Sequence, residues 1–225
     1  RAILTGDELE MYITRISGTT GIFRSRRAST AAAWSSPVKV DVFPSNAGAE
    51  AITPDGLTLY LQVADDLLVA TRASTAAEFS TPSALVNLNT TSVELWVSID
   101  PTNTTLHFVS DRDGAMKLYR TERDQPSGPF GAPIIVDAPL GAFSPVVTAD
   151  GLGLYYGEPT PSGVFPRYTS RPSITSAFPP GAEIPGLTFP QGAWTAWISP
   201  DQCRAYMIGP APGGPGDNDV NLATR

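Results

Sequence analysis

Histidine, cysteine and lysine are the scarcest of the chemically versatile residues in this chain. His107 is the single histidine, Cys203 is the single cysteine, and Lys39 and Lys117 are the two lysines. One cysteine cannot form a disulfide within the chain. One histidine and one cysteine are too few ligands for a zinc site. They also give little support for a Cys–His nucleophile pair.

Clustered positive charge and long apolar runs are missing too. The 15 basic residues are scattered and the net charge is −7, so no nucleic-acid partner is expected. No apolar run approaches the 18 or more residues of a membrane span, and we expect no membrane insertion. No phosphate-binding loop or metal motif stands out, so the sequence predicts no cofactor.

Turn-forming residues are abundant. The 225 residues include 20 glycines and 22 prolines, while 41% of the chain is apolar. That composition is too rich in turns for a helical protein, and its apolar residues are spread too evenly for disorder. It is typical of many short strands joined by tight turns.

An internal repeat is the strongest signal. Residues 53–60 (TPDGLTLY) and 148–155 (TADGLGLY) are near copies, and the register of their aspartates reveals three more copies. The aspartates are Asp7, Asp55, Asp100, Asp150 and Asp201, at intervals of 48, 45, 50 and 51 residues. Five residues after the aspartate, four copies carry Tyr12, Tyr60, Tyr155 and Tyr206, and the third reaches the same column at His107 after a two-residue insertion. Intervals of this length are typical of propeller blades.

A second anchor is an arginine that ends the third strand of every copy. These arginines are Arg27, Arg72, Arg123, Arg171 and Arg225. Seven residues beyond the first four come Trp34, Phe79, Phe130 and Phe178. One such arginine per copy indicates a repeated structural bond, to the turn aspartate or to a backbone carbonyl. The same structural interpretation applies to the aspartates.

Each copy reads as four strands. In the second copy they are expected at about residues 50–53, 57–63, 67–72 and 83–88. The Ser/Thr-x-Asp-Gly element between the first two is turn chemistry, because short side-chain oxygens bond nearby backbone N–H groups and glycine supplies a positive φ. A four-stranded sheet of this kind has two apolar faces, and a ring of such sheets buries both of them.

These motifs resemble the propeller repeats of the TolB family. The resemblance is carried by TPDGLTLYL (residues 53–61), SDRDG (110–114), LYR (118–120) and DVNLATR (219–225), and it spans essentially the whole chain. It implies a scaffold that binds proteins or small ligands, located in the periplasm, in the cell envelope or outside the cell. Repeats of this class are fused to many unrelated domains, so the resemblance is specific for fold and not for function.

The sequence therefore predicts an all-β fold, a β-propeller of five four-stranded blades in one domain, residues 1–225. The repeats are approximately residues 1–48, 49–93, 94–142, 143–193 and 194–225. The fifth copy stops at Arg225, before the aromatic segment and fourth strand of the others. The last blade is therefore expected to have three strands, or the chain is a fragment of a longer ring of six blades.

Two glutamates are the candidate catalytic residues. Glu50 and Glu94 fall near the starts of the first strands of copies two and three, where side chains can face a central channel. Glycosidic cleavage needs one carboxyl group to protonate the leaving oxygen and a second to attack or to activate water. Two isolated acidic residues are weak evidence for an enzyme, and a glutamate near this position is common in the repeat family.

Acidic hairpins are the candidate metal sites. Asp111 and Asp113 in one hairpin, and Asp217 and Asp219 in another, offer carboxylates that calcium prefers. Aspartate is also an ordinary turn residue, so the hairpins explain these positions without a metal.

Tryptophan offers the candidate ligand contact. Trp96 and Trp197 share one first-strand column and are expected to fill the core between blades. Trp194 is the better candidate for an exposed binding residue. His107 is expected to be an ordinary strand residue on a half-buried face.

Three functions are compatible with these features. The first is a non-enzymatic scaffold that binds a protein or a small ligand through its rim loops or its channel mouth. The second is a carbohydrate-binding, lectin-like propeller, and the third is a glycosidase-like enzyme that uses Glu50 and Glu94.

Overall fold

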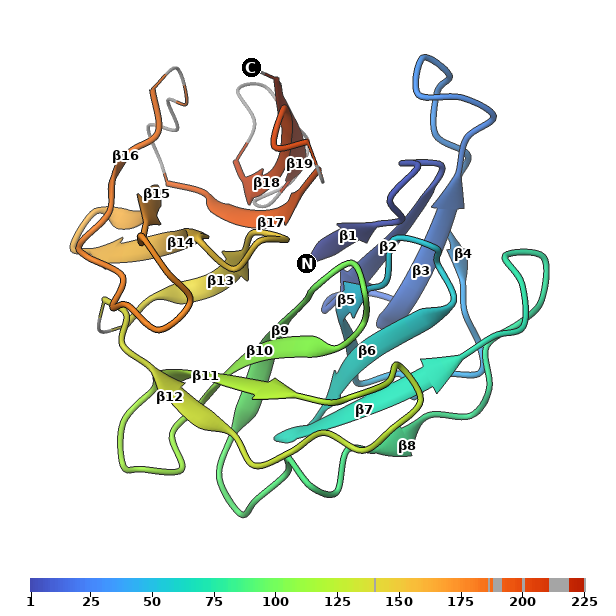
Figure 1. Ribbon diagram of the computed structural model, residues 1–225. Coiled ribbons are helices and arrows are strands. Elements are labelled where there is room, and N and C mark those ends of the chain that lie inside the picture. Colours follow the sequence, from blue (N-terminus) through green and yellow to red (C-terminus); the bar gives the residue numbers. More distant parts are fainter. Residues whose placement is uncertain (140, 186, 188–191, 200, 211–218, 225) are drawn as a thin grey trace.

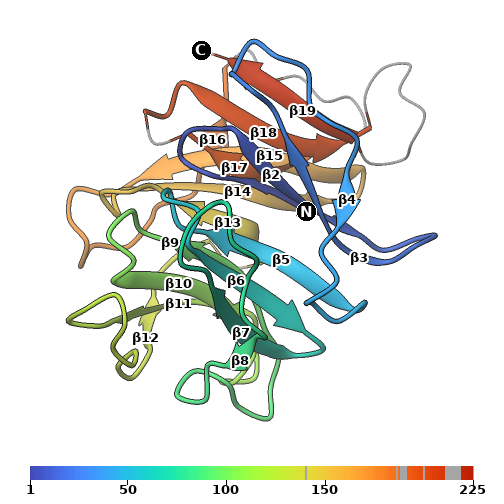
Figure 2. The same ribbon diagram turned by 90° about the vertical axis from the view of Figure 1, so that its right-hand side faces the viewer.

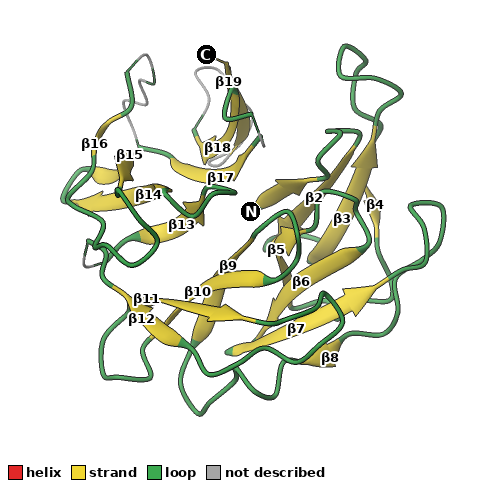
Figure 3. Ribbon diagram, viewed as in Figure 1, coloured by secondary structure: helices red, strands yellow, loops and turns green. Residues whose placement is uncertain are grey.

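The computed structural model describes residues 1–139, 141–185, 187, 192–199, 201–210 and 219–224. Within these residues every regular element is a β-strand (Figure 3). No helix among them could cross a membrane. The strands form five antiparallel sheets, and each sheet corresponds to one copy of the repeat.

Each sheet is one blade with its strands in chain order. Blade 1 consists of β1 (Ala2–Leu4), β2 (Glu10–Arg15), β3 (Gly21–Arg26) and β4 (Val38–Lys39). Blade 2 consists of β5 (Ala47–Ile52), β6 (Thr58–Val63), β7 (Asp66–Thr71) and β8 (Ser83–Ala84). Blade 3 consists of β9 (Glu94–Ile99), β10 (Thr105–Ser110), β11 (Lys117–Glu122) and β12 (Ile134–Val136). Blade 4 consists of β13 (Phe143–Val147), β14 (Gly153–Thr160), β15 (Gly163–Ser170) and β16 (Ala182–Glu183). Blade 5 consists of β17 (Trp194–Ile198), β18 (Arg204–Gly209) and β19 (Asp219–Thr224).

The blades surround a central axis, and the first strand of each lies innermost (Figure 1). Contacts join β1 to β5, β5 to β9, β9 to β13, β13 to β17, and β17 back to β1. Figure 1 shows the N-terminus, where β1 starts, in the middle of the ring, and Figure 2 shows the same blades turned by 90°. The structure is therefore the expected five-bladed propeller rather than part of a six-bladed ring, and its fifth blade has three described strands.

The second copy shows how closely strand bounds follow the sequence. Its first strand begins at Ala47, three residues earlier than expected, and its second and third strands agree to within one residue. The fourth strand was expected to reach Leu88 but contains only two residues. The chain turns immediately afterwards, where the N–H groups of Leu88 and Asn89 donate to the carbonyl of Leu85.

The Ser/Thr-x-Asp turns have the predicted chemistry. In blade 1 the Thr5 hydroxyl donates to Asp7 at 2.6 Å, and the same carboxylate accepts the N–H of Leu9 at 3.0 Å. Copies two, four and five repeat both bonds through Asp55, Asp150 and Asp201. Blade 3 differs because Asp100 accepts the N–H groups of Thr104 and Thr105 across its insertion. The turn aspartates therefore fix the link between the first and second strands.

A β-bulge interrupts the first strand of blades 2 to 5. The register of β5 against β6 shifts between Ala49 and Ala51, and equivalent shifts occur in β9, β13 and β17. Trp96 and Ser144, in two of these bulges, have positive φ values of 56° and 48°. A bulge places an extra residue on the strand and re-aims its side chain, here beside the axis of the ring.

The core lies between blades rather than within them. Tyr12, Leu59 and Phe79 belong to a cluster that joins blades 1 and 2. The residue before the tyrosine column faces the preceding blade, and it is large and buried in blades 1 to 4. These residues are Met11, Leu59, Leu106 and Leu154. Blade 5 has Ala205 at this position, and the consequence is a groove described below.

Candidate functional site

The central cavity is lined by all five blades. It has a volume of about 100 Å³, and its walls are mainly apolar residues of the first strands and the turns that follow them. Arg1 and Glu50 are its charged residues among those described. A space of this size is smaller than the roughly 300–1,000 Å³ of typical small-molecule sites.

Glu50 occupies the cavity because it is the extra residue of the β5 bulge. Its carboxylate accepts a hydrogen bond from Nη1 of Arg1 at 3.0 Å, and Arg1 also donates to the carbonyl of Val97. Burial raises the pKa of Glu50, while Arg1 and the backbone N–H groups of Val97 and Trp96 act in the opposite direction. The pair therefore bridges blades 1, 2 and 3 across the axis.

Glu94, the second candidate acid, lies elsewhere. It is fully buried at the start of β9, where it accepts bonds from Ser110 and Thr90 and forms an ion pair of 3.0 Å with Arg112. It does not line the central cavity. The expectation that both glutamates face one channel is wrong, because Glu94 stands at the first position of its strand and Glu50 at the bulge.

The repeated arginines have the structural role predicted for them, and the bond is to backbone carbonyls. In the four described copies Nε donates to a turn carbonyl at 2.7 to 2.9 Å; the pairs are Arg27 with Glu8, Arg72 with Gly56, Arg123 with Asn103 and Arg171 with Gly151. Each guanidinium also lies 4.2 to 4.6 Å from the centre of the aromatic ring seven residues later; the rings are Trp34, Phe79, Phe130 and Phe178. Arg225 lies outside the described residues.

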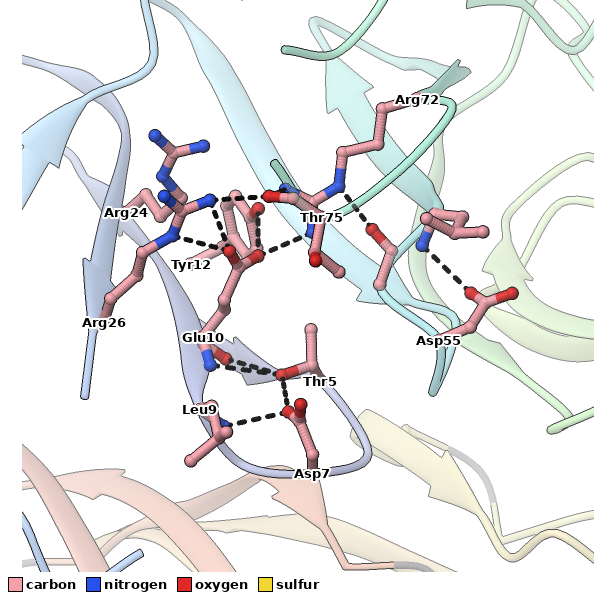
Figure 4. Close-up of polar contacts among 12 residues, drawn as sticks. Thr5, Asp7, Leu9, Glu10, Tyr12, Arg24, Arg26, Asp55, Arg72 and Thr75 are labelled. Carbon is pink, nitrogen blue, oxygen red and sulfur yellow. Dashed lines mark hydrogen bonds and ion pairs between the residues drawn. The ribbon is translucent and has the colours of Figure 1, made fainter. Parts of the chain in front are cut away.

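Three of these four arginines, but not Arg171, also bind a side chain of the preceding blade. Between blades 1 and 2, Nη2 of Arg72 donates to Glu10 at 2.6 Å, and Glu10 also accepts bonds from Arg26 and from the Tyr12 hydroxyl (Figure 4). Burial alone would raise the pKa of Glu10, but its bonds with Arg72, Tyr12 and Arg26 outweigh burial and hold that pKa below its usual range. Between blades 2 and 3, Arg123 instead donates to the Tyr60 hydroxyl at 2.9 Å.

Aromatic side chains gather on the first strands of blades 3 to 5. The ring of Phe143 lies 4.3 Å from that of Trp96 and 5.6 Å from that of Trp194, measured between ring centres. All three residues are half-buried. Trp194 is more buried than the sequence predicts, and Trp96 is less buried than a core residue. Trp197, also expected in the core, is half-buried against Tyr206.

The acidic hairpins do not gather ligands. Asp111 accepts the N–H of Val93 at 3.0 Å, and Asp113 accepts the Tyr119 hydroxyl at 2.7 Å. No group of three or more His, Cys, Asp or Glu side chains in the described part of the chain could hold a metal ion. Asp217 lies outside the described residues, and Asp219 is described only as the first residue of β19.

His107 is more deeply buried than a half-buried strand face implies. It is 4% exposed in β10, at the interface between blades 3 and 4. Burial, and then the charges of Arg171 and Arg120, lower its pKa to about 3. His107 is therefore neutral at physiological pH.

A larger groove lies between blades 4 and 5. Its volume is about 560 Å³, and its walls include Tyr155, Tyr168, Ile198 and Arg204. The two tyrosine rings lie 4.6 Å apart between centres. Sequence reasoning missed this groove, although one signal was present: Ala205 stands where the other blades carry leucine or methionine.

Comparisons with known proteins identify the fold. No protein-family model and no curated protein matches the chain. Among solved structures, a TolB-like protein from Agrobacterium tumefaciens has a TM-score of 0.61 and 14% identity, over 99% of this chain and 76% of that one. TolB from Acinetobacter baumannii has a TM-score of 0.56 and 12% identity, and the alignment spans about half (51%) of that protein and 99% of this chain. The α-L-arabinofuranosidase PaAbf62A from Podospora anserina, solved with cellotriose, has a TM-score of 0.56 and 15% identity, over 95% of this chain and 84% of that one.

The fold is a β-propeller shared with these proteins. Identities of 12 to 15% show the fold alone, because propellers of one architecture serve unrelated functions.

Proposed function

We propose that this chain is a single-domain, non-enzymatic propeller that binds a protein segment or a small ligand at its rim, in the groove between blades 4 and 5. The observation that carries the proposal is the size and lining of that groove. Its volume of about 560 Å³ lies within the range of small-molecule sites, and its walls combine two adjacent tyrosine rings with a few polar groups such as Arg204. The central cavity is smaller and is bridged by Arg1 and Glu50.

The glycosidase alternative gains no support from the described residues. Cleavage needs two carboxyl groups on either side of the bond. Glu50 is the one carboxylate among the described residues of the central cavity, and Glu94 is paired with Arg112 outside it.

An Ala205→Leu substitution tests the groove. It supplies the leucine that blades 2 to 4 carry at this column, so we expect it to fill part of the groove while the fold is retained. Cys203 also lines the groove and is the single cysteine, so a small trifluoromethyl tag on its sulfur gives one ¹⁹F NMR signal that reports on ligands. We expect a saturable change of this signal with at least one member of a panel of aromatic amino-acid amides, short peptides and oligosaccharides. In the Ala205→Leu variant the dissociation constant should rise at least tenfold, which corresponds to about 1.4 kcal/mol.

The matched control is Ala73→Leu, at an exposed position of blade 2. It adds the same side chain far from the groove and should leave binding unchanged. A ligand that binds both variants and the native chain equally would show that the groove is not the site. A panel without any binder would remove small-ligand binding from the proposal.

Carbohydrate binding is the second candidate, and a different observation favours it. Sugars stack on aromatic faces, and the half-buried residues Trp194, Phe143 and Trp96 lie side by side across three blades as a candidate platform. We expect Trp194→Ala to weaken the binding of oligosaccharides such as xylotriose and cellotriose by about tenfold, as measured by calorimetry. Trp34→Phe, on the loop of blade 1, serves as the control and should change nothing. Equal affinities in the native chain and the Trp194→Ala variant would exclude the platform.

The proposed location is the periplasm, the cell envelope or the exterior of the cell. The TolB-like fold and the expectation from the repeat motifs support it. Fractionation of cells that express the tagged native gene would test it, and an exclusively cytoplasmic signal would overturn it.

A further inference from the structure

Three buried nitrogen atoms lack hydrogen-bond partners at one place in the ring. They are Nε2 of His107, Nη2 of Arg171 and Nε of Arg120. All three side chains line a cavity of about 100 Å³ at the interface between blades 3 and 4. His107 is 4% exposed and Arg171 is 5% exposed. Buried polar groups in proteins are almost always hydrogen-bonded, so a cluster of unpartnered donors indicates that an acceptor occupies the cavity.

The buried Arg171 at this cavity has no acidic partner among the described residues. No carboxylate of the described residues forms an ion pair with Arg171, and burial together with the charge of Arg120 lowers the pKa of Arg171. Arg120 has a single acidic partner, Glu122, which is mostly exposed at the rim. The two other acids at the cavity are committed to their own turns: Asp100 accepts the N–H groups of Thr104 and Thr105, and Asp150 accepts bonds from Thr148 and Leu152.

The interface between blades 1 and 2 contains a carboxylate acceptor that the interface between blades 3 and 4 lacks among its described residues. Between blades 1 and 2 the equivalent arginine, Arg72, is neutralised by the carboxylate of Glu10. The column of Glu10 holds Thr105 in blade 3, as the strand register shows: Glu10 pairs with Arg26, and Thr105 pairs with Glu122.

Between blades 2 and 3 the equivalent arginine donates to a hydroxyl group instead of a carboxylate. Arg123 donates to the hydroxyl of Tyr60, and His107 in the same column has no hydroxyl to offer Arg171. The interface between blades 3 and 4 thus lacks both kinds of acceptor.

We propose that this cavity binds a small carboxylate ion, which accepts hydrogen bonds from Arg171, Arg120 and His107. The ion takes the place that the Glu10 side chain occupies between blades 1 and 2, where that carboxylate also accepts from two arginines and the column residue. A volume of about 100 Å³ suits an ion of the size of acetate. Exposed Ile174 and Glu122 at the rim give the cavity an opening to solvent.

The protonation state of His107 is compatible with this role. Burial, then Arg171 and Arg120, lower its pKa to about 3, and the charge of Asp100 acts in the opposite direction. A neutral imidazole has one N–H donor, and with that proton on Nε2 it donates into the cavity. Bonds from Arg171 and Arg120 to a carboxylate are charge-assisted and carry the larger share of the affinity.

The experiment uses His107 as its own reporter. As the single histidine it gives one set of ring C–H signals in a ¹H–¹³C NMR spectrum. The native chain is titrated with sodium acetate at constant ionic strength, with sodium chloride as the balancing salt, and separately with phosphate. We expect a saturable shift of the His107 signals with acetate and a clearly weaker response to phosphate. A linear response shared by all salts, or tighter binding of phosphate than of acetate, would overturn the proposal.

Matched variants separate binding from folding. Arg120→Gln should weaken acetate binding at least tenfold, whereas Arg24→Gln, at the same column of blade 1, should leave it unchanged. His107→Tyr restores the repeat residue and supplies a hydroxyl for Arg171. Acetate should raise the melting temperature of the native chain and not that of the folded His107→Tyr variant. An equal rise in both would also overturn the proposal.

Discussion

Replacement of Glu10 by glutamine is expected to lower the free energy of unfolding by about 3–5 kcal/mol, because it leaves a buried arginine without its counter-charge. The Arg72 side chain is fully buried, and Glu10 lies 2.6 Å from it. Glutamine has nearly the same shape, so the loss reflects charge and hydrogen bonding rather than packing. Urea unfolding followed by tryptophan fluorescence measures it.

Glu78→Gln is the matched control. Glu78 is 72% exposed and lies 3.7 Å from Arg24 at the same blade interface. An exposed ion pair contributes about 0–1 kcal/mol, so the control should be nearly as stable as the native chain. Similar losses in both variants would show that the buried pair has no special role.

Acid should reveal the same interaction. The pKa of Glu10 is lowered, so its contribution to stability is fully present above the ordinary glutamate pKa of about 4.3 and is lost as the pH falls through the lower, folded-state value. The difference in unfolding free energy between the native chain and Glu10→Gln should therefore be constant near neutrality and shrink below about pH 4.3. A difference that stays constant down to pH 2 would contradict the lowered pKa.

The second large effect is expected from Phe79→Ala. Phe79 is 4% exposed, and its ring contacts those of Tyr12 and Phe43 and the guanidinium of Arg72. Truncation of a buried phenylalanine leaves a cavity and costs about 3–5 kcal/mol. Loss of the ring also removes the support of Arg72, so we expect the upper end of this range.

Ile16→Ala provides the comparison for Phe79→Ala. Ile16 is 87% exposed in the hairpin between β2 and β3, and its truncation should change stability by no more than about 0.5 kcal/mol. A loss below 1 kcal/mol for Phe79→Ala would mean that the aromatic segment adds little to the contact between blades 1 and 2.

The blades themselves could be predicted from the sequence because each rests on local chemistry. Asp55 with Thr53 specifies a turn, and Arg72 with Phe79 specifies the return of the chain after the third strand. These contacts lie within one repeat, so their spacing recurs in most copies. The number of blades also followed, since five copies of similar length are visible in the sequence.

The sites were harder to predict because they depend on contacts between copies. Glu50 enters the central cavity through a β-bulge, and Glu94 does not, yet both lie near a first strand in the sequence. His107 is buried because it lies at the contact with the next blade, near Arg171. Ala205 is visibly smaller than the leucine or methionine of the other copies, but the groove it leaves appears only when blades 4 and 5 are packed together.

The repeated arginine has one further consequence. Three of the four described arginines meet a different acceptor on the preceding blade: Glu10 for Arg72, the hydroxyl of Tyr60 for Arg123, and the hydroxyl of Tyr206 for Arg27. The donor is thus the same at each of these contacts, and the acceptor differs. A chain that exchanged its second and third copies would give Arg123 the carboxylate of Glu10 but would leave Arg72 beside His107, which offers neither a carboxylate nor a hydroxyl. The acceptor on one blade, rather than the arginine on the next, therefore distinguishes one contact between blades from another.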